Sequence, residues 1–241
     1  MKITFAAACL GIALSSATVL AGQAEQKPAA PTSPAGAAAA GQGSGWAPQV
    51  SPSDPSAALD PKQAEITKKV SAYFNTLSDL KGAFVQTTAD GKKMKGKFLV
   101  KRPGRFRFDY ALPSKQIIIS DGENLAIQDL DLNNEDRVAL DQTPFRLLLR
   151  KDVDLARDAK IIEAQETDDI IVLALQDKSP DAPGKIKLFL STKPELELKE
   201  WQTTDPQNLE TRVEISQLTK GEEIDAKLFK IEGVSFNNFH P

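Results

Sequence analysis

The sequence has almost no histidine or cysteine. Its single histidine, His240, stands beside the C-terminal proline, and its single cysteine is Cys9. One histidine cannot supply the paired side chains on which most zinc sites and Ser-His-Asp hydrolases depend. A disulfide within one chain needs two cysteines. These two shortages favour a binding, carrier or structural role over catalysis.

The chain also lacks an excess of charge of one sign. Its 241 residues include 30 Lys+Arg and 33 Asp+Glu, which gives a formal net charge of −3. A nucleic-acid-binding protein normally shows a basic excess, because it has to neutralise phosphates. The balance therefore predicts no nucleic-acid partner.

Signatures of catalysis are missing as well. The sequence contains no Gly-x-Ser-x-Gly, no Gly-rich phosphate loop followed by Lys-Ser/Thr, and no His-Glu-x-x-His. We therefore expect no enzyme, no cofactor and no bound metal. A hydrolase that uses two carboxylates in a cleft is the alternative, since 33 acidic residues offer many pairs. Nothing in the sequence singles out two of them.

The first residues have the pattern of an export signal. Met1-Lys2 gives a positive start, residues 3–20 are apolar or small, and Val19-Leu20-Ala21 suits a cleavage site. We expect residues 1–21 to be a signal peptide that is cleaved near Ala21. Cys9 is then removed with it, so the mature chain is expected to have no thiol.

Residues 22–59 have the composition of a linker. Of these 38 residues, 27 are Ala, Pro, Gly or Ser. Such a segment cannot bury enough apolar surface to offset the entropy that it would lose on ordering. We expect a disordered tether at 22–59 and one folded domain at 60–241.

The folded domain is predicted to begin with a helix. Asp60 is a good N-cap, Pro61 fits the first helical position, and Gln63 stands three residues after the cap. This start predicts a helix to about residue 77, with one face against a core. The core-facing residues, at helical spacing, are Ile66, Val70, Tyr73 and Leu77.

From residue 82 onward the apolar period changes to two, and turn residues recur every few positions. Short strands at such spacing predict an antiparallel sheet or barrel in a mainly β domain with some helix (α+β). No repeat of about 34 or 40 residues accompanies them, which argues against a solenoid or propeller. The eleven predicted strands are residues 82–89, 93–101, 105–111, 116–120, 124–130, 136–141, 159–166, 169–176, 184–191, 195–204 and 209–218.

A short apolar helix is predicted between two of these strands, at residues 143–150. Thr143 can cap it, and Pro144 can occupy its first position. Phe145, Leu148 and Leu149 then fall on one face.

Aromatic side chains gather on one face of the early strands. Alternation along residues 105–110 sends the aromatics to one face and the charged residues to the other. We interpret this face as a concave, aromatic-lined surface, with a plain hydrophobic core as the alternative. Trp201 belongs either to the same surface or to the core. The aromatics of this face are Phe84, Phe98, Phe106, Phe108 and Tyr110.

Two basic clusters stand in the same strands. They are Lys92-Lys93-Lys95 and Lys101-Arg102. They could meet anionic lipid or an acidic partner, or they could be ordinary residues on the solvent face of strands.

Four stretches, in this order and spacing, resemble the family of periplasmic outer-membrane lipoprotein carriers, LolA. Each stretch alone is a weak signal, but together they are specific, and the resemblance extends over roughly residues 60–232. The stretches are Phe84–Gln86, Gly96–Phe108, Ile119–Gly122 and Thr143–Phe145.

The resemblance implies an incompletely closed antiparallel β-barrel whose short helices form a lid over a hydrophobic cavity. By match of motif, Arg102 corresponds to the family's arginine that holds the lid closed, Phe106 to an aromatic at the cavity mouth and Phe145 to the lid helix. We hypothesise that Arg102 donates hydrogen bonds to backbone carbonyls of residues 144–150 in the empty state. The residues expected to bind acyl chains are Phe84, Phe98, Arg102, Phe106, Phe108, Tyr110, Phe145, Leu148, Leu149 and Trp201.

The resemblance also implies a function and partners. The expected function is a monomeric periplasmic chaperone that carries lipoproteins from the inner to the outer membrane. Its expected partners are triacylated lipoproteins, an ATP-driven release complex in the inner membrane and an outer-membrane receptor lipoprotein. The alternative is a related periplasmic module with the same fold that binds a lipid or glycolipid or senses the state of the envelope.

Overall fold

The structure is a computed structural model that describes residues 59–233. The predicted signal peptide and all but the last residue of the predicted tether lie outside the described residues, as do His240 and its neighbours. Within the described range, no helix is long and apolar enough to cross a membrane.

Helix α1 (Pro61–Thr76) begins where the sequence predicts. The Asp60 side chain accepts a hydrogen bond from the backbone N–H of Lys62 at 2.9 Å, and Pro61 occupies the first turn. The helix ends at Thr76, and its C-cap, Leu77, has an extended backbone. The predicted core-facing stripe is confirmed, with two additional residues: the buried side chains of α1 are Ile66, Thr67, Val70, Tyr73 and Phe74.

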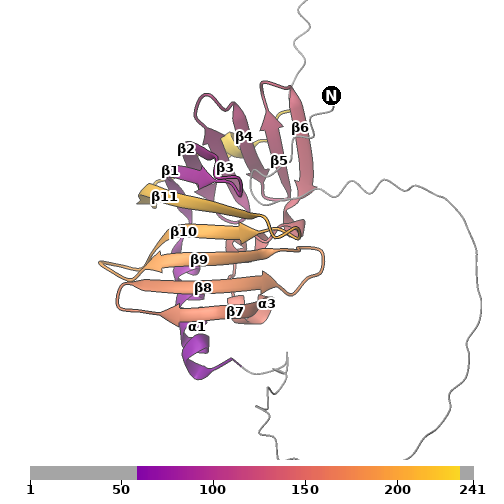
Figure 1. Cartoon of the computed structure of the whole chain (residues 1–241). Helices are drawn as coiled ribbons and strands as arrows, with labels where there is room; N and C mark the ends of the chain where they lie inside the picture. Colours follow the sequence, from indigo (N-terminus) through magenta and orange to yellow (C-terminus); the bar gives the residue numbers. More distant parts are fainter. Residues whose placement is uncertain (1–58, 234–241) are drawn as a thin grey trace, which may run out of the picture. The chain divides into compact units, whose positions relative to one another are not determined.

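Eleven strands form one antiparallel sheet, as predicted. The sheet is open, because β6 and β7 lie at its two edges in the order β6-β5-β4-β3-β2-β1-β11-β10-β9-β8-β7. Figure 1 shows β8–β10 running across the direction of β4–β6. The strands are β1 (Asp79–Thr87), β2 (Lys93–Lys101), β3 (Arg105–Tyr110), β4 (Gln116–Asp121), β5 (Asn124–Asp129), β6 (Asn134–Ala139), β7 (Ala159–Glu166), β8 (Ile170–Asp177), β9 (Lys185–Ser191), β10 (Glu197–Thr204) and β11 (Glu210–Lys220).

The start of β1 differs from the prediction. The strand begins at Asp79, so Gly82 lies inside it, directly opposite Phe98 of β2. A Cβ atom at Gly82 would lie 2.8 Å from the Phe98 ring, and one at Gly96 would lie 2.7 Å from the Phe84 ring. Each glycine therefore leaves room for the ring of its cross-strand partner. The glycine marks a close approach here and not the end of a turn.

Irregular pairings bend the sheet. The register shifts between Lys81 and Ala83 where β1 pairs with β11, between Leu198 and Glu200 where β10 pairs with β9, and at one further place in β7. Such bulges increase local twist and bend the strand that carries them. The bending gives the sheet an inner face, which holds most of the core.

The segment between β6 and β7 covers part of that inner face. It contains the 3₁₀ helix η1 (Leu140–Gln142) and the short helices α2 (Arg146–Leu149) and α3 (Leu155–Asp158). The predicted helix at 143–150 is therefore shorter than expected, and Thr143 does not cap it. Its hydroxyl instead donates to the carbonyl of Leu140 at 2.8 Å, because the preceding 3₁₀ turn leaves that oxygen near.

The outer face of the sheet carries a smaller apolar contact. The 3₁₀ helix η2 (Ala226–Phe229) packs against β3 and β4, and Phe229 is buried there. Arg107, on the outer face of β3, donates to the carbonyl of Leu228 at 3.4 Å. The C-terminal part of the described chain is thus fixed to the face opposite the aromatic side chains.

Candidate functional site

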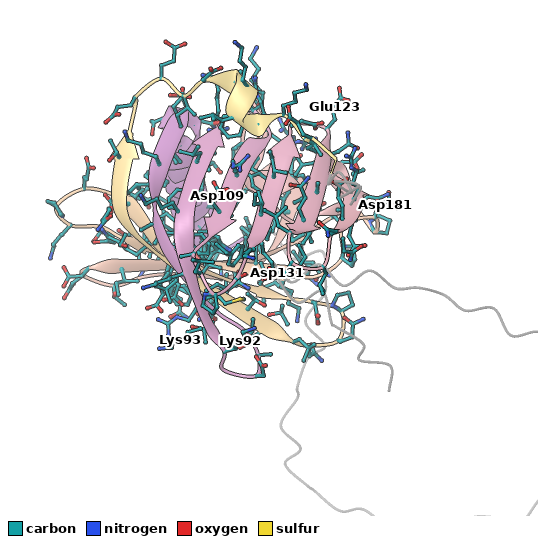
Figure 2. All side chains as sticks on the ribbon, turned by 90° about the horizontal axis from the view of Figure 1, so that it is seen from above. Lys92, Lys93, Asp109, Glu123, Asp131 and Asp181 are labelled. Atoms are coloured by element: carbon teal, nitrogen blue, oxygen red, sulfur yellow. The ribbon has the colours of Figure 1, made fainter. Side chains whose placement is uncertain are left out.

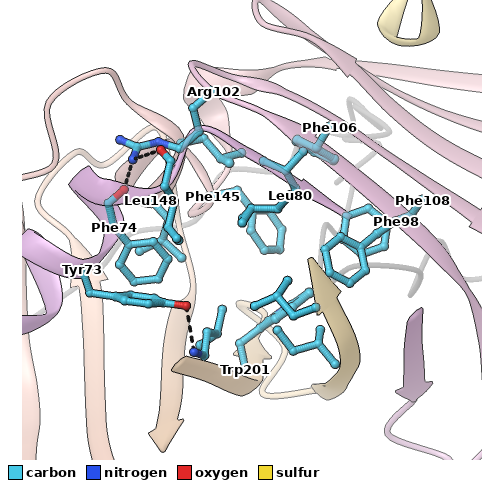
Figure 3. Close-up of a pocket in the computed structure, with 16 residues that line it drawn as sticks. Tyr73, Phe74, Leu80, Phe98, Arg102, Phe106, Phe108, Phe145, Leu148 and Trp201 are labelled. Carbon is cyan, nitrogen blue, oxygen red and sulfur yellow. Dashed lines mark hydrogen bonds between the residues drawn. The ribbon is translucent and has the colours of Figure 1, made fainter. Parts of the chain in front are cut away.

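An apolar pocket lies on the inner face of the sheet, under α2 and beside the end of α1 (Figure 3). Its open volume is about 100 Å³, and nearly all the side chains around it are apolar. Strands from both halves of the sheet and both helices contribute to it. The lining residues are Tyr73, Phe74, Leu77, Leu80, Phe98, Val100, Arg102, Phe106, Phe108, Phe145, Leu148, Leu149, Leu198, Trp201, Ile215 and Leu218.

Aromatic rings form one wall of the pocket. Phe98 and Phe108 come from neighbouring strands and stack with their ring centroids 5.7 Å apart. Trp201, from the other half of the sheet, meets Phe108 edge to face at 6.1 Å. Phe145, which immediately precedes α2, approaches Phe106 at 6.4 Å. The rings therefore come from three separate parts of the chain.

Eight of the ten residues expected at the site line this pocket. The other two, Phe84 and Tyr110, lie behind the wall: their rings meet edge to face at 5.0 Å, and Phe84 also contacts Phe108 at 5.1 Å. The Tyr110 hydroxyl donates to the side-chain oxygen of the buried Gln86. Alternation placed both on the correct face, but it gives no information on depth along the strand.

The remaining lining residues were not singled out as site residues from the sequence. Tyr73 and Leu77 were recognised as core-facing, but which surface they would cover was unknown. Phe74 is the neighbour of Tyr73 on α1, and the others lie on strands. Val100 follows Phe98 by two residues, a spacing that could have found it, whereas irregular pairings move Leu198 and Leu218 off that spacing. These lining residues are Phe74, Leu80, Val100, Leu198, Ile215 and Leu218.

Arg102 joins the two helices beside the pocket. Its guanidinium donates to the carbonyl oxygens of Phe74 and Leu77 at the end of α1, the latter at 3.1 Å, and to the carbonyl of Arg150 after α2. The sequence hypothesis placed all its acceptors in residues 144–150, and only Arg150 lies there. The α1 acceptors follow from helix geometry, because the last carbonyls of a helix have no partner within it.

The guanidinium of Arg102 is partly removed from water. Burial lowers the pKa of the Arg102 guanidinium from its ordinary value, yet an arginine remains charged at any ordinary pH. Its Nε is buried and has no hydrogen-bond partner among residues 59–233. The group is thus held by three carbonyl dipoles in place of water.

Other polar contacts also hold α2 in place. Arg146 pairs with Asp177 at the end of β8 through two hydrogen bonds of 2.5 and 2.7 Å, and the Asp177 side chain is fully buried. The Gly104 N–H donates to the carbonyl of Leu149 at 2.9 Å. The closure of the pocket therefore rests on a few directed contacts as well as on apolar packing.

The segment after α2 is anchored to α1. The side-chain amide of Asn75 donates to the carbonyl of Val153 and accepts from its N–H, both at 2.9 Å. The hydroxyl of Tyr73, two residues earlier, accepts a hydrogen bond from the N–H of Leu198 at 3.0 Å (Figure 3), and burial raises the pKa of its phenol. No cluster of three or more potential metal ligands occurs in the part of the chain that the structure describes.

The described domain matches a known family. Residues 75–232 match the family model of the outer membrane lipoprotein carrier protein LolA. An outer-membrane lipoprotein carrier protein of Halorhodospira halophila is 28% identical over 184 residues, which cover 73% of this chain and 85% of that protein. One from Chromobacterium violaceum is 32% identical over 165 residues, covering 65% of this chain and 78% of that protein.

Among solved structures, a LolA superfamily protein from Nitrosomonas europaea covers 68% of this chain and 97% of its own, with 10% identity and a TM-score of 0.40. The family match is a match of sequence. It extends from the end of α1 to the residues beyond η2 and includes every strand. The chain belongs to the family of the outer membrane lipoprotein carrier protein LolA.

Proposed function

We propose that this protein carries lipoproteins by binding their acyl chains in the pocket under α2. The observation that supports this most directly is an apolar pocket whose cover is fastened by polar contacts. Burial of each methylene group contributes about 0.8 kcal/mol, so several acyl chains bind well to such a surface. The names of its relatives describe the same cargo.

The pocket has to open before it can take an acyl chain. Its volume of about 100 Å³ is well below the roughly 300–1,000 Å³ of pockets that enclose drug-sized ligands. Movement of α2 would remove Phe145, Leu148 and Leu149 from the aromatic wall and enlarge the space. Re-closure restores those contacts in the empty protein, which reduces the net gain from retaining the ligand and assists release.

We propose a place for this step in the cell. The chain is exported after cleavage near Ala21, and it acts in the periplasm as a monomer without enzymatic activity. Residues 22–59 serve as a tether before the carrier domain. The protein receives triacylated lipoproteins from an ATP-driven release complex in the inner membrane, and an outer-membrane receptor lipoprotein accepts them.

Native mass spectrometry of the protein purified from periplasm, with and without co-expression of a triacylated lipoprotein, tests the proposal. We expect a one-to-one complex with the intact lipoprotein. Purification of an empty protein from both preparations would contradict the proposal. A free lipid or glycolipid in place of the lipoprotein would contradict the cargo and support the alternative lipid-binding module.

A pair of adjacent variants locates the cargo. Ile215 lines the pocket, whereas the side chain of Glu214 points to the opposite face of β11. Ile215→Trp should fill the pocket and abolish the complex, and Glu214→Trp should leave it intact. Equal retention of lipoprotein by both variants would show that the acyl chains bind elsewhere.

A further inference from the structure

Exposed leucines gather in the loops at one end of the sheet. Leu112, between β3 and β4, is 74% exposed; Leu130 and Leu132, between β5 and β6, are 43% and 60% exposed. Isolated exposed apolar residues are normal on a protein surface, but a contiguous group of large ones is not. Three leucines in two adjoining loops therefore need an explanation.

Backbone contacts place these loops side by side with the hairpin between β1 and β2. The N–H of Ala111 donates to the carbonyl of Lys95 at 2.8 Å, and the N–H of Leu130 donates to the carbonyl of Lys115 at 3.2 Å. Lys115 also pairs with Asp131 at 2.7 Å. The leucines and the hairpin thus form one continuous edge.

Lysines accompany the leucines along this edge. Lys92, Lys93 and Lys95 are exposed, and within residues 59–233 none of them forms an ion pair. Figure 2 shows Lys92 and Lys93 projecting from the tip of the hairpin. Two nearby acids have other partners: Asp90 accepts from the Thr88 hydroxyl and from the backbone N–H of Lys92, and Asp131 pairs with Lys115.

Asp129, at the end of β5, accepts the N–H groups of Asp131 and Leu132 at 2.9 and 3.1 Å. It therefore fixes the loop that presents Leu132 and does not neutralise the hairpin. The edge therefore presents lysines that form no ion pair within residues 59–233 beside exposed apolar side chains.

We propose that this leucine–lysine edge, made of Lys92, Lys93, Lys95, Leu112, Leu130 and Leu132, docks on the surface of an anionic lipid bilayer. A peripheral membrane site combines apolar side chains that enter the headgroup boundary with cations that meet anionic lipid. The proposal goes beyond lipoprotein carriage, since it concerns the bilayer and not the cargo.

The edge is separate from the pocket. Lys93 is at the start of β2, whereas Arg102 follows the end of β2. Leu112 follows the end of β3, and the start of β3 lies on the side of Arg102. The edge and Arg102 are therefore at opposite ends of these two strands. Contact with a bilayer through these loops would leave α2 and its polar contacts free to move. Variants at the edge are therefore expected to fold and to keep the pocket unchanged.

Flotation, with vesicles, of the protein purified from periplasm tests the proposal. We expect binding to vesicles of phosphatidylethanolamine and phosphatidylglycerol, weakened by salt, and much weaker binding to phosphatidylcholine alone. Each lysine beside an anionic surface contributes about fivefold, so Lys92→Gln, Lys93→Gln and Lys95→Gln together should lower binding about 100-fold. Leu112→Ser with Leu132→Ser should lower it about tenfold.

Matched variants serve as controls. The triple change Lys62→Gln, Lys68→Gln and Lys160→Gln removes the same charge from exposed lysines elsewhere, and Ile170→Ser removes an apolar side chain that is 47% exposed on β8. Neither should change vesicle binding more than twofold. Absence of binding to anionic vesicles at low salt, or equal loss in the control variants, would overturn the proposal.

A dye at position 112 reports the docking directly. Because the mature chain is expected to have no cysteine, the variant Leu112→Cys can be labelled with an environment-sensitive fluorophore, and Ile170→Cys gives the control. Anionic vesicles should shift the emission at position 112 to shorter wavelength and leave position 170 unchanged. An equal response at both positions would contradict docking through this edge.

Discussion

Replacing Arg102 with leucine tests whether the guanidinium keeps α2 closed over the pocket. Of its three acceptors, only the Arg150 carbonyl lies on the segment that has to move, because the other two belong to the end of α1. A hydrogen bond to a charged group contributes about 1.5–3 kcal/mol. Its loss should shift the equilibrium toward the open state by a factor of about 10 to 140.

The lower end of this range applies, because the contact with Arg150 is near the surface and water can replace it. If acyl chains bind under α2 as proposed, they compete with closure of the empty protein, so Arg102→Leu should hold its ligand more tightly, with release about tenfold slower. The assay is stopped-flow measurement of the rate at which a fluorescent acylated peptide leaves the protein for excess vesicles.

Arg105→Leu is the matched control for this prediction. It makes the same substitution three residues away, on the outer face of β3, where the side chain does not line the pocket. Its release rate should equal that of the unmodified protein. An unchanged release rate in folded Arg102→Leu, or an equal change in both variants, would refute the reasoning.

Three further predictions concern stability and are measured by urea unfolding. Gly96→Ala should lower the free energy of unfolding by about 2 kcal/mol, because a Cβ there would lie 2.2 Å from a backbone carbonyl oxygen. Gly233→Ala, with open space around it, should leave the stability unchanged. Equal stability of the two variants would contradict the close approach at Gly96. Asp177→Asn should lower the free energy of unfolding by about 3 kcal/mol, since it removes the buried negative charge that pairs with Arg146, and Asp169→Asn, from an exposed pair, should lower it far less. Because burial raises the pKa of Tyr73, the folded state prefers the neutral phenol. The stabilisation of the folded state by its neutral Tyr73 phenol is complete below the unfolded pKa of about 10 and declines above it. Tyr73→Phe should therefore lose less stability at alkaline pH than the unmodified protein does. An identical dependence of stability on pH in the two proteins would disprove this.

Local patterns predicted α1, the helix near α2 and the strands of the fold, but not η1, α3 or η2. The cap and proline at Asp60-Pro61 marked the start of α1, and period-two alternation found all eleven strands. The ends of elements were less reliable where a residue has two meanings. Gly82 is typical of a turn, but here it accommodates a phenylalanine ring from the next strand.

The site was predicted less completely, because its geometry depends on contacts between distant segments. Alternation assigned Tyr110 to the inner face but could not show that it lies behind the pocket. Arg102 was found through its motif, yet its acceptors on α1 depend on how a helix packs across the sheet. The pairing of Arg146 with Asp177 spans 31 residues, and no sequence spacing indicates it.

The open sheet has a mechanical consequence. The strands at its two edges, β6 and β7, are consecutive in the chain, and the segment that joins them, residues 140–158, contains α2. The cover of the pocket is therefore also the covalent link between the two free margins. Separation of β6 from β7 and movement of α2 away from the pocket would therefore be a single movement. A bulkier cargo could widen the whole sheet in this way without any hinge in its strands.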